Sequence, residues 1–332
     1  QNRIYGPHYS ILGNGDNQLI RVETLSYANQ RVISGNYFEG GGRVAITING
    51  DQSQLYITDN TFRLMRTAIY LSGNPAPVIT GNTMEQIFLY NAYPYAVRLY
   101  NFGGPFKFLE NKIYVSNRNC LNIHNYTGVA GEEGLIANNF FRSGGGTSNK
   151  TGISIDGASN LKIYSNNINV LGSNTLNGRS MYITGTSSGL QVINNILCNS
   201  CEGYSYYVND PTDITASDYN DIYSSGHTLA YWGGTQVPTL DSLRNLSGKD
   251  IASISEDPGY YEPATNLHVT NPALDSAATS LPEITIDIDG DLRDPNYPDI
   301  GADEFVPGNY PPYVVNHLPD VSYREDGGRH LI

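Results

Sequence analysis

The chain has 332 residues, enough for one large domain or two ordinary ones. Its formal net charge is −13, only 15% of its residues are charged, and it holds 36 Asn, 35 Gly and 26 Tyr against 5 Lys. This balance argues against a nucleic-acid binder, because neutralising phosphates requires Lys and Arg. No apolar run reaches the length of about 18 residues that marks a membrane-spanning helix. The composition instead favours a β protein with many tight turns.

A short motif, Asn-x-apolar, recurs along the first two thirds of the chain. Its copies begin 22 to 29 residues apart, at Asn36, Asn60, Asn82, Asn111, Asn138, Asn166, Asn195 and Asn220. Most copies carry an apolar residue three positions earlier, namely Ile33, Ile57, Ile79, Phe108, Leu135, Ile163 and Val192. A fixed period of this length is typical of stacked repeat architectures.

A second strand is expected before each motif, because apolar residues there alternate with a period of two. The pairs are Ile20/Val22, Ile46/Ile48, Ile69/Leu71, Val97/Leu99, Leu121/Ile123, Ile153/Ile155, Met181/Ile183 and Tyr206/Val208. Turn dipeptides such as Asn-Gly and Asp-Gly follow these strands. We therefore predict an all-β solenoid of about eight or nine coils. Its corners would carry Asn, which tolerates left-handed backbone and can stack into a ladder.

Over roughly residues 10–225 this pattern resembles the right-handed parallel β-helix superfamily of pectate, alginate and chondroitin lyases and mannuronan epimerases. The resemblance implies a right-handed parallel β-helix. It implies no single activity, because the superfamily also includes adhesins and phage tailspikes.

Later segments resemble the tail of secreted bacterial β-helix proteins of the choice-of-anchor type. They are Asn271–Ser276, Asp287–Arg293 and Asp299–Glu304. Residues 311–332 resemble the opening strand of an Ig-like or cadherin-like module. The resemblance implies an exported, cell-surface-associated bacterial protein. We therefore divide the chain into a β-helix (1–225), an irregular acidic cap (226–308), and a linker with the first strand of an Ig-like module (309–332).

Outward side chains of the predicted strands fall into three columns. The first holds Arg21, Thr47, Tyr70, Arg98, Asn122, Ser154, Tyr182 and Tyr207. The second holds Glu23, Asn49, Ser72, Tyr100, His124, Asp156, Thr184 and Asn209. The third, of small residues, holds Ala45, Ala68, Ala96, Cys120, Gly152, Ser180 and Ser205.

Three outward residues make a candidate catalytic group: Arg98, His124 and Asp156. Coils stack about 4.8 Å apart, so Asp156 can orient the imidazole of His124 as a general base. Arg98 would neutralise a uronate carboxylate with paired hydrogen bonds. The predicted substrate-binding residues around them are Tyr70, Tyr100, Asn122, Tyr182 and Tyr207. This set suits β-elimination or epimerisation of an acidic polysaccharide.

Other functions remain open. A glycosidase is less supported, because the only carboxylates in the outward columns, Glu23 and Asp156, lie about five coils apart. The alternative to glycan binding is a non-catalytic structural or adhesive surface protein. It would act as a rigid spacer, or assemble with other surface modules or copies of itself.

The C-terminal segment suggests a metal. Asp287, Asp289 and Asp291 alternate as in half of a Ca²⁺ loop, which makes Ca²⁺ the candidate cofactor. The alternative is a solvated cap at the open end of the solenoid, with Arg293 paired to Asp303 or Glu304.

Two further features come from cysteine usage and from the charge distribution. Cys198 and Cys201 form a CxxC pair that we expect to be a local disulfide, which leaves Cys120 unpaired. Residues 1–150 hold 12 basic and 9 acidic residues, whereas residues 151–332 hold 7 and 23. The first half is therefore weakly basic and suited to an acidic glycan.

Overall fold

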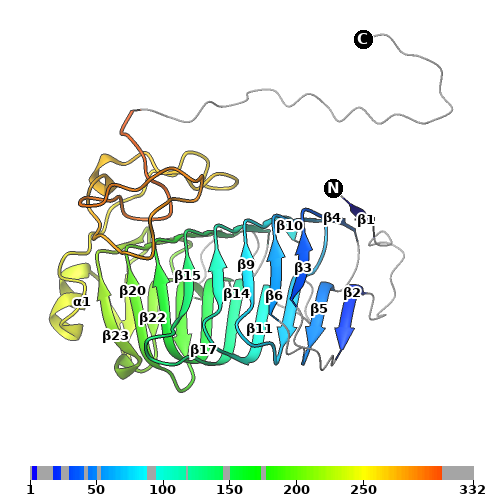
Figure 1. Ribbon diagram of the computed structural model, residues 1–332. Helices are drawn as coiled ribbons and strands as arrows, with labels where there is room; N and C mark the ends of the chain where they lie inside the picture. The colour runs from blue at the N-terminus through cyan, green and yellow to red at the C-terminus, as the bar shows by residue number, and fades with distance from the viewer. Residues whose placement is uncertain are drawn as a thin grey trace, which may run out of the picture.

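Alternating strands and turns wind the chain into a parallel β-solenoid of about seven turns, slightly fewer than the eight or nine expected. The computed structural model describes residues 2–5, 18–23, 30–40, 44–50, 54–87, 95–116, 119–144, 150–172 and 177–308. The proposed Ig-like strand in 309–332 lies outside them. Figure 1 shows the coils side by side, from blue strands at one end to α1 (Leu240–Ser247) at the other. Among the described residues, no helix is long and apolar enough to cross a membrane.

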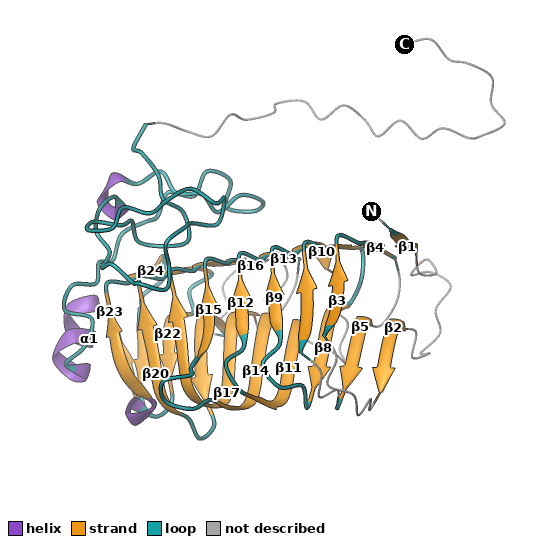
Figure 2. Cartoon of the chain, viewed as in Figure 1, coloured by secondary structure: helices purple, strands orange, loops and turns teal. Residues whose placement is uncertain are grey.

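Two sheets form the walls of the solenoid (Figure 2). Sheet A contains β1 (Arg3–Tyr5), β4 (Tyr37–Glu39), β7 (Thr61–Arg63), β10 (Thr83–Ile87), β13 (Lys112–Val115), β16 (Phe140–Ser143), β18 (Asn167–Leu171), β21 (Ile196–Ser200) and β24 (Asp221–Ser224). Sheet B consists of two parallel ladders. The long strand β17 (Lys150–Tyr164) belongs to both and joins them.

We name the two ladders of sheet B separately. Besides β17, ladder B1 contains β2 (Gln18–Glu23), β5 (Val44–Asn49), β8 (Thr67–Ser72), β11 (Tyr95–Gly103), β14 (Asn119–Thr127), β19 (Gly178–Thr184), β22 (Tyr204–Val208) and β25 (Ala230–Trp232). Ladder B2 contains β3 (Arg31–Ser34), β6 (Leu55–Thr58), β9 (Val78–Thr80), β12 (Lys107–Leu109), β15 (Gly134–Ala137), β20 (Ser188–Ile193) and β23 (Ile214–Asp218). A short strand, β26 (Thr235–Val237), runs antiparallel to β25.

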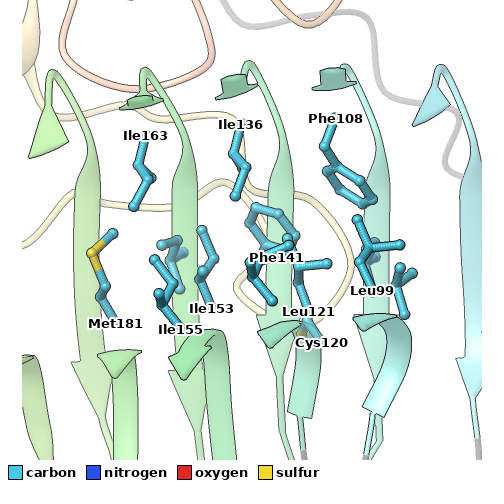
Figure 3. Packing of buried hydrophobic residues seen from close by; sticks show 14 of the residues in the cluster. Leu99, Phe108, Cys120, Leu121, Ile136, Phe141, Ile153, Ile155, Ile163 and Met181 are labelled. Atoms are coloured by element: carbon cyan, nitrogen blue, oxygen red, sulfur yellow. The ribbon is translucent and has the colours of Figure 1, made fainter. Parts of the chain in front are cut away.

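The core is a stack of equivalent apolar residues from successive coils. In ladder B1, Leu121 pairs in register with Ile153, and Ile153 with Met181. In ladder B2, Phe108 pairs with Ile136 (Figure 3). These side chains are fully buried, and each contributes about 1.5–3 kcal/mol of hydrophobic stabilisation. The apolar period read from the sequence is thus the period of the core.

A ladder of asparagines runs through the corner before sheet A. The Asn60 amide Nδ2 and backbone N–H both donate to Oδ1 of Asn82, at 3.0 and 3.1 Å. The same bonds recur from one coil to the next as far as Asn220. There Nδ2 donates to Asp250 Oδ1 at 3.1 Å and the backbone N–H donates to Ser253 Oγ. The segment that follows α1 therefore supplies the acceptors for the last rung.

The ladder corrects one motif position. Asn139, not Asn138, occupies the ladder, so the inward apolar partner is Ile136 rather than Leu135. Asn138 has φ 52° and stands one residue earlier, where other coils have left-handed residues such as Gly81 and Glu110. The left-handed corner thus precedes the ladder residue. Two adjacent asparagines hide which one fills each role.

The third predicted column is not outward. Its members, including Cys120 and Ser180, are buried because ladder B1 bends there toward sheet A. Ser180 Oγ donates to the carbonyl of Cys198 at 2.7 Å, and a side chain at Gly152 would strike Ile168. These positions are small because the two sheets meet there.

Only the first part of the predicted cap (226–308) covers the end of the solenoid. Leu243 of α1 joins the main core at that end. The later segment folds back instead, and Leu267 and Ile288 belong to a second apolar cluster with Phe140 and Ile196 of sheet A. We call residues 257–308 the flank cap, which appears in orange above the strands in Figure 1.

Candidate functional site

The outward residues of ladder B1 form the first two predicted columns. In one column Tyr100 pairs in register with His124, and His124 with Asp156. The other runs through Tyr70, Arg98, Asn122, Ser154, Tyr182, Tyr207 and Tyr231. We call this surface the B1 face. The side chain of Glu23 lies outside the described residues.

His124 and Asp156 are hydrogen-bonded neighbours. The distance from His124 Nδ1 to Asp156 Oδ2 is 2.7 Å. A carboxylate can only accept, so Nδ1 donates and the lone pair of a neutral ring lies on Nε2. The two side chains are 23% and 47% exposed, so solvent reaches both. The geometry is that of an oriented imidazole base.

Arg98 joins this pair through an aromatic ring. Its Cζ lies 5.0 Å from the centroid of the Tyr100 ring. The Tyr100 ring stacks on the His124 ring at 4.6 Å, with 2° between the planes. The Nε atom of Arg98 is buried and has no hydrogen-bond partner. The predicted group of Arg98, His124 and Asp156 therefore lies together, with a guanidinium that retains an unused donor.

Tyr95, at the start of β11, also lies at this site, although the sequence pattern did not predict it. Burial raises its pKa, a rise that a hydrogen bond with Ser154 and the charge of Arg98 only partly oppose. The charges of Asp156 and Tyr182 also act on it, so its hydroxyl lies among the predicted site residues. Tyr95 precedes the inward pair by two residues, beyond the bend in the strand, and the period of two did not identify it.

A second cluster lies toward the C-terminal coils. Arg179 Cζ is 4.4 Å from the Tyr182 ring centroid and 4.9 Å from that of Tyr207. Tyr207 stacks on Tyr231 at 4.3 Å, and Tyr204 packs edge-on against both. The Nε atom of Arg179 is also buried without a hydrogen-bond partner. Only Tyr182 and Tyr207 of this cluster were predicted.

The remaining predicted contacts differ in access. Tyr70 lies beside Arg98 in register and is partly exposed. Asn122 is only 3% exposed, so its side chain lies within the column rather than on its surface. Tyr100 and Tyr182 are partly exposed and accompany the two arginines. The B1 face thus carries two Arg–Tyr clusters, three strand spacings or about 14 Å apart.

The predicted Ca²⁺ residues do not converge. Asp287 is buried, and its Oδ1 accepts the backbone N–H groups of Asp289 and Asp291. Asp291 is exposed. Hydrogen bonds from His268 and Lys112 hold the pKa of Asp289 well below its usual range. The alternating acids build a turn, because a short Asp side chain caps its own backbone.

The predicted disulfide is wrong. None of the three cysteines, all within the described residues, forms a disulfide, and all three are buried. Cys198 lies in the extended strand β21, whereas Cys201 follows that strand at a bend, where its backbone N–H donates to Asn199 Oδ1. Cys198 belongs to the second apolar cluster, whereas Cys201 packs against Gly178. The expected ion pair of Arg293 is confirmed with Glu304, at 3.3 Å.

Neither a scan against protein-family models nor a search of curated proteins finds a match to this chain.

Proposed function

We propose that the B1 face binds an acidic polysaccharide. The observation that carries this proposal is the pair of partly exposed guanidinium groups, Arg98 and Arg179, each held against tyrosine rings of the B1 face. A carboxylate on the solvent side of each guanidinium would accept charge-assisted hydrogen bonds from its terminal N–H groups. An anionic ligand is the chemistry that completes both clusters.

The shape of the surface favours a polymer. The outward Tyr rings lie on five strands (β8, β11, β19, β22 and β25) and so span seven successive strands of ladder B1, from Tyr70 to Tyr231. Aromatic faces with a few polar groups suit the alternating apolar and hydroxyl faces of sugars. Two cationic points about 14 Å apart fit a chain with repeated acidic groups better than one small anion.

We place this activity outside the cell. The support is the resemblance of the repeat to pectate lyase-like β-helix proteins, and of the segments around Asp287–Arg293 to exported choice-of-anchor proteins. Fractionation of the native host, followed by detection of the chain, tests the location. Recovery only from the cytoplasm would contradict it.

Titration calorimetry with oligosaccharides tests the binding proposal. We expect uronate oligomers to bind, neutral oligomers of the same length to bind at least ten-fold more weakly, and added salt to weaken the uronates. Arg98→Gln and Arg179→Gln should each lower uronate affinity about ten-fold, or about 1.4 kcal/mol. Lys107→Gln, which removes an exposed charge from ladder B2, is the matched control.

Absence of binding across acidic glycans would contradict the proposal and favour a structural or adhesive protein. An equal loss of uronate affinity in the Lys107 variant would mean that net charge, rather than the two arginines, determines binding.

Proton abstraction beside a bound uronate is the second candidate function, favoured by the 2.7 Å contact between His124 and Asp156. His124 Nε2 would take the proton next to the carboxylate, and the neutral Tyr95 hydroxyl would donate to the leaving oxygen. His124→Ala should abolish formation of unsaturated product while retaining binding. Tight binding without product in the wild type would restrict the function to recognition.

A further inference from the structure

A second cluster of reactive side chains lies in the flank cap, away from the B1 face. One atom each from His268, Asp289 and Asp303 lies within 4.8 Å of the others. Asp303 is 6% exposed, and its Oδ2 has only a long 3.4 Å bond from the backbone N–H of Val269. These three residues come from separate turns of an irregular segment, which is why their approach is not visible in the sequence.

Both ring nitrogens of His268 face oxygen acceptors. Asn266 Oδ1 accepts the backbone N–H of His268 at 3.0 Å, which fixes the amide orientation. The same Oδ1 lies against Nδ1 of the ring. At the other nitrogen, Nε2 is 2.5 Å from Asp289 Oδ2. A neutral imidazole has one N–H, so two such contacts require either a proton on both nitrogens or a cation in place of one proton.

A cation at Nε2 meets this requirement without a second ring proton. Asn266 then accepts Nδ1–H and directs the Nε2 lone pair toward Asp289 and Asp303. A histidine held at one nitrogen by an oxygen, with the other nitrogen facing carboxylates, is the usual arrangement of a metal-ligating histidine. The ligating acids have supporting bonds too, because Lys112 Nζ donates to Asp289 Oδ1 at 2.9 Å.

We infer that His268, Asp289 and Asp303 bind one first-row divalent transition metal ion, with Zn²⁺ as the best match. The set offers one imidazole nitrogen and two carboxylate oxygens, which suit Zn²⁺ better than the all-oxygen preference of Ca²⁺. Metal–ligand bonds of about 2.0–2.2 Å require the 2.5 Å contact to open by roughly an ångström. Water would complete the coordination.

Such an ion would fasten three turns of the flank cap to one another where the cap rests on the solenoid. The His268 ring packs edge-on against Phe140 of β16 at 5.0 Å, and Lys112 belongs to β13. The ion would therefore join the cap turns at the point where they meet sheet A. Because it binds only the folded cap, it should raise the temperature at which the cap opens.

The experiment uses the full chain, treated with EDTA and dialysed. Calorimetry with ZnCl₂ should show one site, CaCl₂ at the same concentration should show none, and CoCl₂ should give visible absorption typical of mixed nitrogen and oxygen ligands. His268→Gln and Asp303→Asn should each weaken Zn²⁺ binding at least a hundred-fold. Asp291→Asn, which alters an exposed acid nearby, should bind like wild type.

Wild-type measurements keep the inference testable if a variant misfolds. Nitrogen NMR of the His268 ring should show a metal-bound Nε2 with Zn²⁺. If both nitrogens are protonated and Zn²⁺ does not bind, the contact is an imidazolium ion pair and the inference is overturned. Equal Zn²⁺ affinity in both variants would overturn it as well.

Discussion

The solenoid and the flank cap are held together in different ways. In the solenoid each coil repeats the contacts of its neighbours, so that Asn82, for example, bonds the coils before and after it. In the cap, single polar side chains hold several turns at once. Arg293 donates to Glu304, to Asn138 Oδ1 and to the carbonyls of Asp299 and Gly301.

Stability is spread over many equivalent contacts in the solenoid and concentrated in a few side chains in the flank cap. A stacked array resembles a sum of repeat and interface terms, so one lost rung is one term among several. The flank cap has little regular structure. Its turns are held instead by the buried guanidinium of Arg293, a side chain with five N–H donors. We therefore expect local failure in the cap at a single residue and a graded response in the solenoid.

The largest expected effect comes from Arg293→Met. Removing one partner of a buried charged network costs about 3–5 kcal/mol, since Glu304 and two backbone carbonyls lose their hydrogen bonds from the guanidinium. Hydrogen exchange should show the region around 285–305 opening while ladder B1 stays protected. Lys107→Met, at an exposed position, should leave both regions unchanged. Simultaneous loss of protection everywhere would show that cap and solenoid form one unit.

The next effect should come from Asn139→Ala within the solenoid. Its Nδ2 donates to the carbonyls of Phe108 and Ala137, and its Oδ1 accepts from Asn111. Leaving these buried groups unpaired should cost about 2–4 kcal/mol. Urea unfolding gives the value, with the exposed Asn245→Ala as the matched control. A loss equal to the control would mean that the ladder adds no stability.

The smallest effect concerns Asp213, beside the last coils. Burial, with help from Asp210, raises its pKa to about 6, and its Oδ2 has no hydrogen-bond partner. The folded pKa exceeds the unfolded one, so the stability that protonated Asp213 contributes is present at low pH and is lost as pH rises through about 6.

Asp213→Asn should consequently stabilise the chain by about 1 kcal/mol near pH 8 and change little near pH 4. Urea midpoints at both values measure this difference. A variant that is less stable near pH 8 would show that the carboxylate makes a favourable contact there.

Much of the solenoid could be predicted from its repeat. The alternation around Leu121 and Ile153 identifies the inward pairs, and the Asn-x-apolar copies identify the ladder. The single register error arose at Asn138 and Asn139, because adjacent identical residues fit two adjacent roles. The contact between His124 and Asp156 could also be predicted, since parallel stacking fixes which positions become neighbours.

Other site residues could not be found this way. Tyr95 and Arg179 precede the bend in ladder B1, where the period of two no longer reports the outward side. The expected disulfide was wrong, because the CxxC spacing does not bring two sulfur atoms together when the first cysteine lies in an extended strand.

The sequence by itself determined the coil, the core and the order of residues on the B1 face, because equivalent positions of successive repeats become neighbours when the coils stack. The tertiary structure alone decided how the acidic segment folds back onto sheet A, which side chains meet Arg293, and that His268 meets Asp289 and Asp303. Irregular turns have no period, so their contacts depend on the path of the whole chain.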